Sequence, residues 1–576
     1  MNLANLGLSG LFAAQKRLQV AGHNLNNADT VGYNRQSVLS QTAGSVGTGS
    51  GFYGRGVQAV TVQRSYDNFL YQQLVRSQTA GAALVSYGNE ISQLDNLFSD
   101  RTVGISPALQ KFFDGLEALA SKPADSSARQ ELLGRAESLA TQINDATAYM
   151  NRVSENINTQ LDTTVTQINS YLERINDVNQ QIVTAKGTNP FHEPNDLLDQ
   201  REQLVSELSQ LVDVRTVEQN GRISVTTVGG QLLLGADKVY PLHAVRSAEN
   251  PERVVVGFTS SLDDNGKPVI SEFRDGALKG GTLGGLLQFR AESLEPAINS
   301  LGRLAVGLAH SVNDLHRQGY DLKGEQGGDF FSVSGPKVTA NGRNSTSSSV
   351  PAVSFYKEQV DPADPSKGYT QPVDQLTGQS YRLERINGQF QLRNLTTNAV
   401  SPLNDANTNG GVTKVDGMEI DVSSLAGQSA DGDSWLIQPT ALGGTSLSVN
   451  IKNPQDIAAA GKDEDGNPLG TANGEIAQKL GALRNEKVLG NGSLSLNDAF
   501  GQIVNRIAVQ TQQNGTAAKA QAKLIEQNYA AQQALSGVNM DEEYIMLERY
   551  QEQYRAASRL IDISSQLFDT LLNLRT

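Results

Sequence analysis

A narrow apolar stripe runs along each end of this chain. Between residues 11 and 28, large and small apolar side chains alternate at steps of three and four, and a stretch near the C-terminus does much the same. Such spacing places a single seam on each helix, which is typical of a coiled-coil partner and not of a helix covering a broad core. We therefore expect the two ends to pair with each other or with neighbouring subunits, as an assembly device. The seam residues are Leu11, Ala14, Leu18, Ala21, Leu25 and Ala28 at the first end, and Leu547, Tyr550, Tyr554, Ala557, Ile561, Ser564, Phe568 and Leu571 at the second.

Each terminal helix on its own would be only marginally stable. Burial of the leucines of the N-terminal seam contributes about 2 kcal/mol each. Fixing the backbone costs on the order of 1–2 kcal/mol per residue, and helical hydrogen bonds offset this only in part. We therefore expect residues 1–30 and 545–576 to be mobile in the free monomer and to become ordered against other copies.

The composition argues against several classes of protein. A length of 576 residues suggests roughly three or four domains. The net charge of −14 argues against a nucleic-acid partner, because no basic run offsets it. The chain has no cysteine, which rules out disulfides, thiolate metal sites and a cysteine nucleophile. No apolar run is long enough to span a membrane, and the N-terminus lacks an ordinary secretory signal, so we expect any export to occur uncleaved and by another route.

Helical and extended patterns alternate along the chain. The longest helical stripe lies in residues 124–186, and at about 1.5 Å per residue it predicts a rod roughly 90 Å long. Alternating residues predict strands at 35–41 and 56–64, joined by a loop rich in glycine and serine. Further strands are expected after Val214 and between 325 and 450. The sequence thus predicts a multidomain α+β protein, with a long helical coiled-coil rod formed by both chain ends and with inserted β-rich domains.

These patterns divide the chain into four regions. We expect a terminal coiled-coil domain for assembly from residues 1–33 and 540–576. A helical rod domain with a short β-hairpin would comprise residues 34–213, 283–324 and 475–539. A small β region would cover residues 214–282, and an outer β-rich domain residues 325–474.

No motif in the sequence indicates catalysis or ligand binding. Residues 49–54 fit a G-x-G-x-x-G pattern, but a strand follows them instead of a helix, so we expect a flexible loop and no phosphate site. His310 and His316 are six residues apart on one helix, which predicts packing or solvent-exposed roles and not a metal pair. Residues 463–467 lack essential positions of a calcium loop. We therefore expect no enzyme activity, no catalytic residue, no cofactor and no metal.

Both ends of the chain resemble the terminal motifs of bacterial flagellar axial proteins. Two internal stretches are similar to those of the hook-associated proteins that join hook to filament. Asp29 stands where these proteins often have Asn, and Val31 where they often have Pro, which frees φ at that turn. The residues that carry the resemblance are 8–14, 27–36, 536–543, Tyr550, Gln551 and 571–574 at the ends, and 195–201, Val312, Asn313, His316, Gly319, Asp321 and Gly324 in the interior.

The resemblance implies a structural component of the bacterial flagellum, located at the hook–filament junction, that adapts hook to filament through the packing of its terminal helices. Terminal helices of many subunits would form concentric coiled coils around an export channel. The implied partners are further copies of the chain in a ring or tube, the hook protein, the next hook-associated junction protein, and a cytoplasmic export chaperone at the C-terminal region, with no nucleic acid and no membrane span. The implied location is the extracellular flagellum, after uncleaved export through the flagellar secretion apparatus.

Two alternatives remain open from the sequence. The first is a hook or rod subunit of the same superfamily, against which the internal stretches argue. The second is a surface enzyme or adhesin carried by the inserted β domain, although residues 325–450 contain no histidine and no spacing that suggests paired carboxylates.

Overall fold

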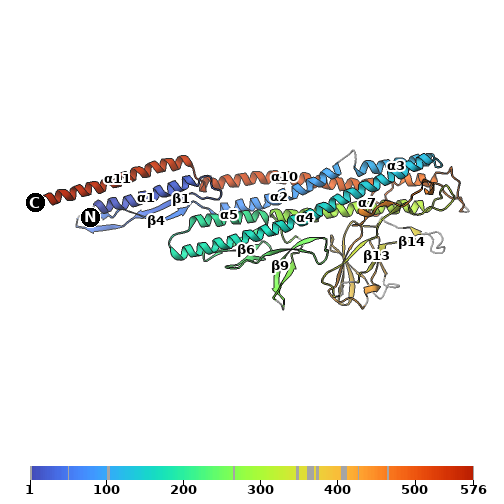
Figure 1. Ribbon diagram of the computed structural model, residues 1–576, viewed down its shortest axis with the longest axis horizontal. Helices are drawn as coiled ribbons and strands as arrows, with labels where there is room; N and C mark the ends of the chain where they lie inside the picture. The colour runs from blue at the N-terminus through green and yellow to red at the C-terminus, as the bar shows by residue number, and fades with distance from the viewer. Residues whose placement is uncertain are drawn as a thin grey trace.

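The chain forms an elongated molecule whose long helices run along its axis (Figure 1). Both chain ends lie at the same end of the molecule, and the β-rich parts lie on one side of the helical rod (Figure 1). This is the multidomain α+β architecture predicted from the sequence. The computed structural model describes residues 3–49, 51–99, 104–263, 266–274, 276–345, 349–359, 369–370, 375–403, 412–425, 427–463 and 466–574.

The first and last helices pack antiparallel against each other, and we call this helix pair the terminal hairpin. Helix α1 covers Leu3–Asn26 and helix α11 covers Met540–Asn573. α11 begins at Met540 because the side chain of Asn539 accepts hydrogen bonds from the first free N–H groups of the helix. Each terminal helix therefore packs against a partner within the same chain. The marginal stability expected for a lone terminal helix leaves out this packing. Mobility of the ends in the free monomer stays a prediction.

A long β-hairpin lies beside α1 (Figure 1). Strands β1 (Gln36–Thr42) and β4 (Val57–Arg64) pair antiparallel, and β2 (Ser45–Thr48) and β3 (Gly51–Gly54) extend the hairpin. The flexible loop expected between the outer two strands is therefore wrong. Gly47 faces Phe52 across the hairpin, and a Cβ on Gly47 would lie 3.2 Å from the ring of Phe52, so this glycine makes room for an aromatic side chain. Ser50, in the middle of the expected loop, lies outside the described residues.

The rod is a bundle of long helices around one continuous hydrophobic core. Its longest helix, α4, has 63 residues without a break, and the predicted apolar stripe from Ile143 to Ile175 is buried. At about 1.5 Å per residue this helix is roughly 95 Å long. The rod helices are α2 (Asn68–Ser99), α3 (Ile105–Ser121), α4 (Ser126–Thr188), α5 (Asn195–Leu211), α6 (Gly281–Phe289), the π-helical turn η1 (Arg290–Leu294), α7 (Glu295–His316), α9 (Glu475–Ala482) and α10 (Leu496–Ser536).

The chain segment between α5 and α6 forms two small antiparallel sheets, and both pack on α4. Their buried residues, such as Val225 and Leu242, belong to the same core as the rod helices. The first sheet has the order β5-β6-β7 and the second β10-β9-β8. The strands are β5 (Val214–Gln219), β6 (Arg222–Thr227), β7 (Leu232–Leu234), β8 (Leu242–Arg246), β9 (Val254–Leu262) and β10 (Pro268–Glu272).

Three asparagines of α4 fasten these sheets to the helix. The side-chain amide of Asn169 donates to the carbonyl of Leu242 and accepts from the N–H of the same residue, both at 2.9 Å. Asn179 makes the same pair of bonds with Ile223. Asn158 bonds the carbonyl of Glu252 and the N–H of Val254. Each asparagine side chain thus satisfies one N–H and one carbonyl group of the sheet backbone that no neighbouring strand bonds.

The outer β-rich part has a hydrophobic core of its own. Trp435, Phe390, Tyr381 and Met418 are buried in it, and Val306 of α7 joins it to the rod. The main sheet has the order β12-β21-β16-β17-β18, and a second sheet has the order β13-β20-β19. The strands are β11 (Phe331–Ser332), β12 (Lys337–Ala340), β13 (Ala352–Phe355), β14 (Glu358–Gln359), β15 (Tyr369–Thr370), β16 (Tyr381–Ile386), β17 (Gln389–Asn394), β18 (Val400–Leu403), β19 (Val412–Val415), β20 (Met418–Asp421), β21 (Ser434–Gln438) and β22 (Ser448–Val449), with the short helices η3 (Ser423–Leu425), α8 (Gly443–Ser446) and η4 (Pro454–Asp456).

The segments that lead into and out of the outer part pack with the rod. The rod core includes Phe330 and Phe331 from the segment that precedes the outer part. It also includes Leu447, Ile451 and Ile457 from the segment that follows it. The core of the outer part therefore draws its residues from a shorter segment than 325–474. The division of the chain into four regions stays a prediction.

Candidate functional site

The terminal helices approach each other through small residues. A Cβ added to Gly7 would lie 2.8 Å from Cγ1 of Ile561 and 3.0 Å from the carbonyl oxygen of Ala557, so only glycine fits at this position without a shift. Further along, Arg17 Nη1 donates to Gln553 Oε1 at 2.9 Å, and its guanidinium lies over the ring of Tyr550. The contact between α1 and α11 is thus close and apolar at Gly7 and polar at Arg17.

The structure divides the predicted seam into an inner and an outer part. The buried members are Ala14 and Ala21 of α1 and Ala557 and Ser564 of α11. Seven members are half-buried: Leu11, Leu18, Leu25, Ala28, Leu547, Tyr550 and Ile561. The last three, Tyr554, Phe568 and Leu571, are exposed, with 62% of Phe568 and 66% of Leu571 accessible.

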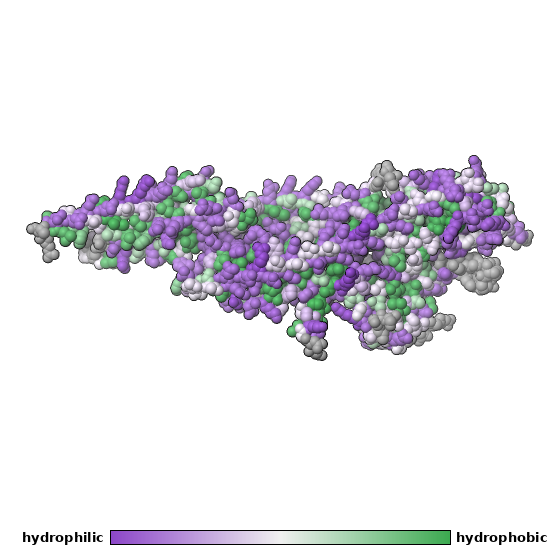
Figure 2. Space-filling model, viewed as in Figure 1, coloured by the Kyte–Doolittle hydropathy of each residue, from purple (hydrophilic) through white to green (hydrophobic). Residues whose placement is uncertain are grey.

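Apolar side chains gather on the outer surface of the terminal hairpin. Figure 2 shows them as green patches among purple on the terminal helices. They include seam residues and others that the seam did not contain: Leu3, Leu8, Phe12, Tyr544, Ile545, Ile563, Leu567 and Leu572. We interpret this gathering of exposed apolar side chains as a contact site.

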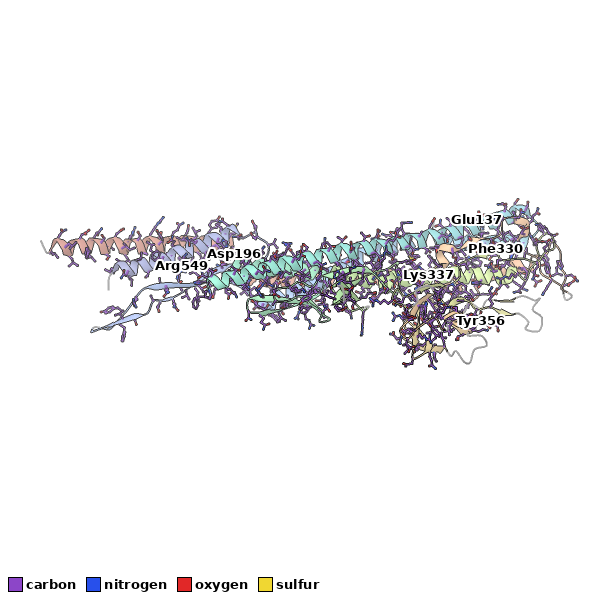
Figure 3. All side chains as sticks on the ribbon, turned by 60° about the horizontal axis from the view of Figure 1, so that its bottom comes forward. Glu137, Asp196, Phe330, Lys337, Tyr356 and Arg549 are labelled. Atoms are coloured by element: carbon purple, nitrogen blue, oxygen red, sulfur yellow. The ribbon has the colours of Figure 1, made fainter. Side chains whose placement is uncertain are left out.

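A buried ionic cluster joins the β-hairpin and the segment after α1 to the rod. Arg64, at the end of β4, donates to Asp199 of α5 at 2.7 Å and to both carboxylate oxygens of Glu202 at 2.6 and 3.0 Å. Asp199 also accepts from the backbone N–H of Asn34 at 2.9 Å and from its side-chain amide at 2.6 Å. We call Arg64, Asp199, Glu202 and Asn34 the joint cluster. Figure 3 labels the neighbouring Asp196, at the start of α5.

Burial dominates the electrostatics of the joint cluster. It raises the pKa of Asp199 and of Glu202 above the ordinary values, although the hydrogen bonds from Asn34 and Arg64 act in the opposite direction. Burial disfavours the charge of Arg64 as well, but the bonds to Glu202 and Asp199 outweigh it and raise the pKa of Arg64. The cluster is thus one cation shared by two carboxylates, an arrangement that holds elements together and offers no free reactive group.

The C-terminal helix is tied to the same place. Arg35 donates to Glu543 at 2.7 Å and to Glu542 at 3.0 Å, both in the first turn of α11. The N–H of Arg35 donates to the carbonyl of Ser536 at the end of α10. Next in the chain, Gln36 donates to Asp196 at 2.7 Å. Residues 34–36 therefore connect α5, α10 and α11, all of which lie far from this segment in the sequence.

Comparison with known proteins identifies the family of this chain. A family model described as the flagellar hook-associated protein FlgK helical domain matches residues 91–331, and one described as flagella basal body rod protein matches residues 2–34. Flagellar hook-associated protein 1 of Salmonella typhimurium is 34% identical over the whole of both chains, and that of Escherichia coli K12 is 33% identical, also over the whole of both. The chain belongs to the flagellar hook-associated protein 1 family. The resemblance inferred from the two ends and the internal stretches is confirmed.

A solved structure supports the same fold. The flagellar hook junction protein FlgK from Burkholderia pseudomallei superposes with a TM-score of 0.71 at 27% identity, covering 81% of this chain and the whole of that one. The predicted fold class is confirmed by this likeness.

Three of the stretches that carried the resemblance to flagellar axial proteins, two from the ends and one from the interior, meet in space. Residues 27–36, 195–201 and 536–543 all contribute to the joint cluster or to the contacts next to it. Arg64 and Glu202 were missed by the sequence analysis. Glu202 directly follows the stretch 195–201, whereas the β-hairpin separates Arg64 from residues 27–36 in the sequence, and neither carries a spacing pattern of its own.

The remaining internal stretch forms a second polar junction, at the end of α7. Asn313 donates to the carbonyl of Phe331 and accepts from the N–H groups of Phe330 and Phe331. His316 is fully buried: its Nδ1 bonds the carbonyl of Gly328 at 2.7 Å, and its Nε2 accepts from the N–H of Ala458 at 2.8 Å. These bonds fix the Nδ1–H tautomer. Figure 3 labels Phe330, near the far end of the rod from Asp196.

His310 and His316 play separate packing roles. The ring of His310 meets Phe355 of the outer part edge-on at 5.1 Å, whereas His316 meets Phe330. Burial lowers the pKa of His316 to about 4, although the bond to Gly328 acts in the opposite direction. Among the residues described, no three side chains of His, Asp or Glu come together as a group that could hold a metal ion.

Three small residues of α1 were missed as contact residues. Gly7, Gly10 and Ala13 line the contact with the last helix or its surroundings, yet only the alanines at 14, 21 and 28 had been assigned to the seam. The signal was present in the sequence, because Gly7, Gly10, Ala14 and Ala21 recur at helical steps. In the described part of the chain, none of the helices is long and apolar enough to cross a membrane.

Proposed function

We infer that this chain is a structural component of the bacterial flagellum that assembles at the hook–filament junction and adapts hook to filament. The observation that carries this inference is the full-length match to flagellar hook-associated protein 1, which spans both terminal helices, the rod and the β-rich parts. Members of this family are structural proteins, and self-assembly within the axial structure and contact with the hook follow from the junction role.

We propose that the outer face of the terminal hairpin makes the contacts between copies. Support comes from the exposed aromatic and aliphatic side chains on this face, including Phe12, Phe568 and Leu571. Burying a large apolar side chain contributes about 1.5–3 kcal/mol. Several such residues per copy would drive association in a ring or tube. The buried seam residues Ala14, Ala21 and Ala557 would instead hold the two helices of one chain together.

We further propose the partners and route that the family resemblance implies. The chain would leave the cell uncleaved through the flagellar secretion apparatus, with an export chaperone covering the C-terminal region before assembly. The exposed apolar side chains of α11 supply a reason for such a cover, because they would otherwise face water in the unassembled chain. In the flagellum, the hook protein and the next hook-associated junction protein would contact this chain from either side.

Deletion of the gene tests the proposed function. Electron microscopy should show hooks without filaments, and unassembled flagellin should appear in the culture medium. Absence of hooks would move the protein to the rod or hook, and normal filaments would overturn the junction role.

A further inference from the structure

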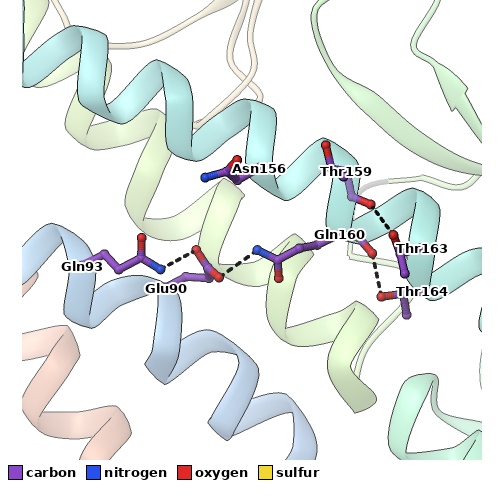
Figure 4. Close-up of a pocket in the computed structure, with 7 residues that line it drawn as sticks. All are labelled: Glu90, Gln93, Asn156, Thr159, Gln160, Thr163 and Thr164. Atoms are coloured by element: carbon purple, nitrogen blue, oxygen red, sulfur yellow. Dashed lines mark hydrogen bonds between the residues drawn. The ribbon is translucent and has the colours of Figure 1, made fainter.

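A polar groove opens on the side of the rod between α2 and α4 (Figure 4). Its volume is about 360 Å³. Nearly all the side chains around it are amides and hydroxyls. Figure 4 shows Gln93, Glu90 and Gln160 in a hydrogen-bonded row between the two helices, with the threonines along α4. The lining includes Glu90 and Gln93 of α2 and Asn156, Thr159, Gln160 and Thr163 of α4.

Glu90 is the charged member of this lining. Only 6% of its surface is exposed. Its Oε1 accepts from Gln160 Nε2 at 3.0 Å and its Oε2 accepts from Gln93 Nε2 at 3.2 Å. In the part of the chain that the structure describes, no lysine, arginine or histidine pairs with it. A buried carboxylate held by neutral amides alone is costly, and a cation placed beside it would lower that cost.

The rest of the groove also offers acceptors. The hydroxyl of Thr163 donates to the carbonyl of Thr159, and the hydroxyl of Thr159 donates to that of Glu155. Their lone pairs are left to accept further hydrogen bonds. One carboxylate surrounded by acceptor oxygens is the environment that an ammonium or guanidinium group prefers.

The rod carries two exposed cations on another helix. Lys519 and Lys523 lie one turn apart on the exposed side of α10, which therefore presents both ammonium groups on one face. Neither forms an ion pair within the described residues. α10 packs against α2 through its other face, where Gln521 bonds the carbonyl of Ser77 and Asn528 bonds the hydroxyl of the same residue. The lysines thus face away from their own bundle.

The groove and the lysines are suited to a contact between copies. Rings and helical tubes are built from heterologous contacts, in which two different patches of the same chain meet. The groove lies on one side of α2, between it and α4, while α10 lies on the other side (Figure 1). We propose that the groove at Glu90 receives Lys519 and Lys523 of a neighbouring copy and forms a lateral contact along the rod. This rests on the proposed function only in that the neighbour is a second copy in the axial structure.

Site-directed cross-linking tests the contact. The chain has no cysteine, so introduced cysteines report single contacts. The full-length variant Gln93→Cys/Lys523→Cys would be the sole copy in cells whose own gene is deleted. Gly81 faces Ile525 and Gly88 faces Asn514, so Gln93 and Lys523 of one chain lie roughly 20 Å apart along the rod and cannot form a disulfide with each other. Oxidation of isolated flagella should therefore yield a ladder of linked copies.

A matched control and a charge variant sharpen the test. Gln93→Cys/Arg174→Cys, with the second cysteine at an exposed site of α4, should give no ladder. Glu90→Gln, added to the first variant, keeps the size of the side chain and should reduce cross-linking several-fold. An equal ladder in the control, no ladder in the first variant, or no effect of Glu90→Gln overturns the contact. Filaments that form normally in these cells would leave the junction role standing, whereas absence of the unsubstituted chain from isolated wild-type flagella would overturn the proposed function itself.

Discussion

Gly7 sets how closely the terminal helices pack. Replacing it with Leu would push a side chain into Ile561 and the backbone of Ala557. Overpacking of this kind costs about 1–3 kcal/mol. We expect amide hydrogens of α1 and α11 to exchange about ten-fold faster or more in Gly7→Leu, measured by mass spectrometry. Gly22→Leu is the control, because nothing lies within 4 Å of a Cβ at that position of the same helix. Equal exchange in the two variants would contradict the close packing.

His316 makes the stability of the rod depend on pH. Its pKa is about 4 in the folded chain and 6.5 in the unfolded one, so between these values the unfolded state binds more protons and stability falls as the pH falls. Between pH 7 and pH 5 the loss is about 2 kcal/mol, at about 1.4 kcal/mol for each pH unit below the unfolded pKa. Thermal melts should show this loss in the wild type and much less of it in His316→Gln. The exposed His192→Gln serves as control, and an unchanged pH slope in His316→Gln would contradict the account.

At the scale of elements, asparagines of α4 hold the small sheets in place. Replacing Asn169 by Ala leaves the N–H and the carbonyl of Leu242 without their partners. An unsatisfied buried polar group costs about 1–3 kcal/mol. We expect Asn169→Ala to lower the unfolding free energy by that amount and to speed amide exchange in β8. Asn151→Ala, at an exposed position of the same helix, should change neither quantity. Unaltered exchange of β8 in Asn169→Ala would show that packing alone holds the sheet.

The sequence predicted the helices better than the connections between them. The buried stripe from Ile143 to Ile175 repeats with helical spacing over a long distance, so α4 was found with nearly its observed bounds. The hairpin extension around Gly47 and Phe52 was missed, because a segment rich in glycine and serine is typical of a loop. Its extended conformation depends on pairing between β2 and β3, which the sequence pattern does not reveal. The joint cluster could not be predicted, because Arg64 and Asp199 are brought together only by the fold.

At the scale of the whole molecule, the joint cluster couples the rod to the β-hairpin and to the segment after α1, and the β-hairpin in turn packs on α1 of the terminal hairpin. Replacing Arg64 by Met would leave Asp199 and Glu202 buried without their shared cation, and breaking a buried pair in this way costs about 3–5 kcal/mol. We expect Arg64→Met to loosen the angle between hairpin and rod, seen as a broader size distribution in small-angle X-ray scattering. Arg76→Met, at an exposed site of α2, is the control. A scattering curve identical to wild type would show that the cluster does not fix this angle.

We expect the outer face of the terminal hairpin to bring the chain into the hook–filament junction. The most direct measurement is electron microscopy of the deletion strain complemented with Phe568→Asp/Leu571→Asp, two changes at exposed positions that leave the contact between α1 and α11 intact. Aspartate at an interface that excludes water is strongly unfavourable. The account predicts bare hooks, flagellin in the medium and secreted but unincorporated variant. Normal filaments carrying the variant at their base would contradict it.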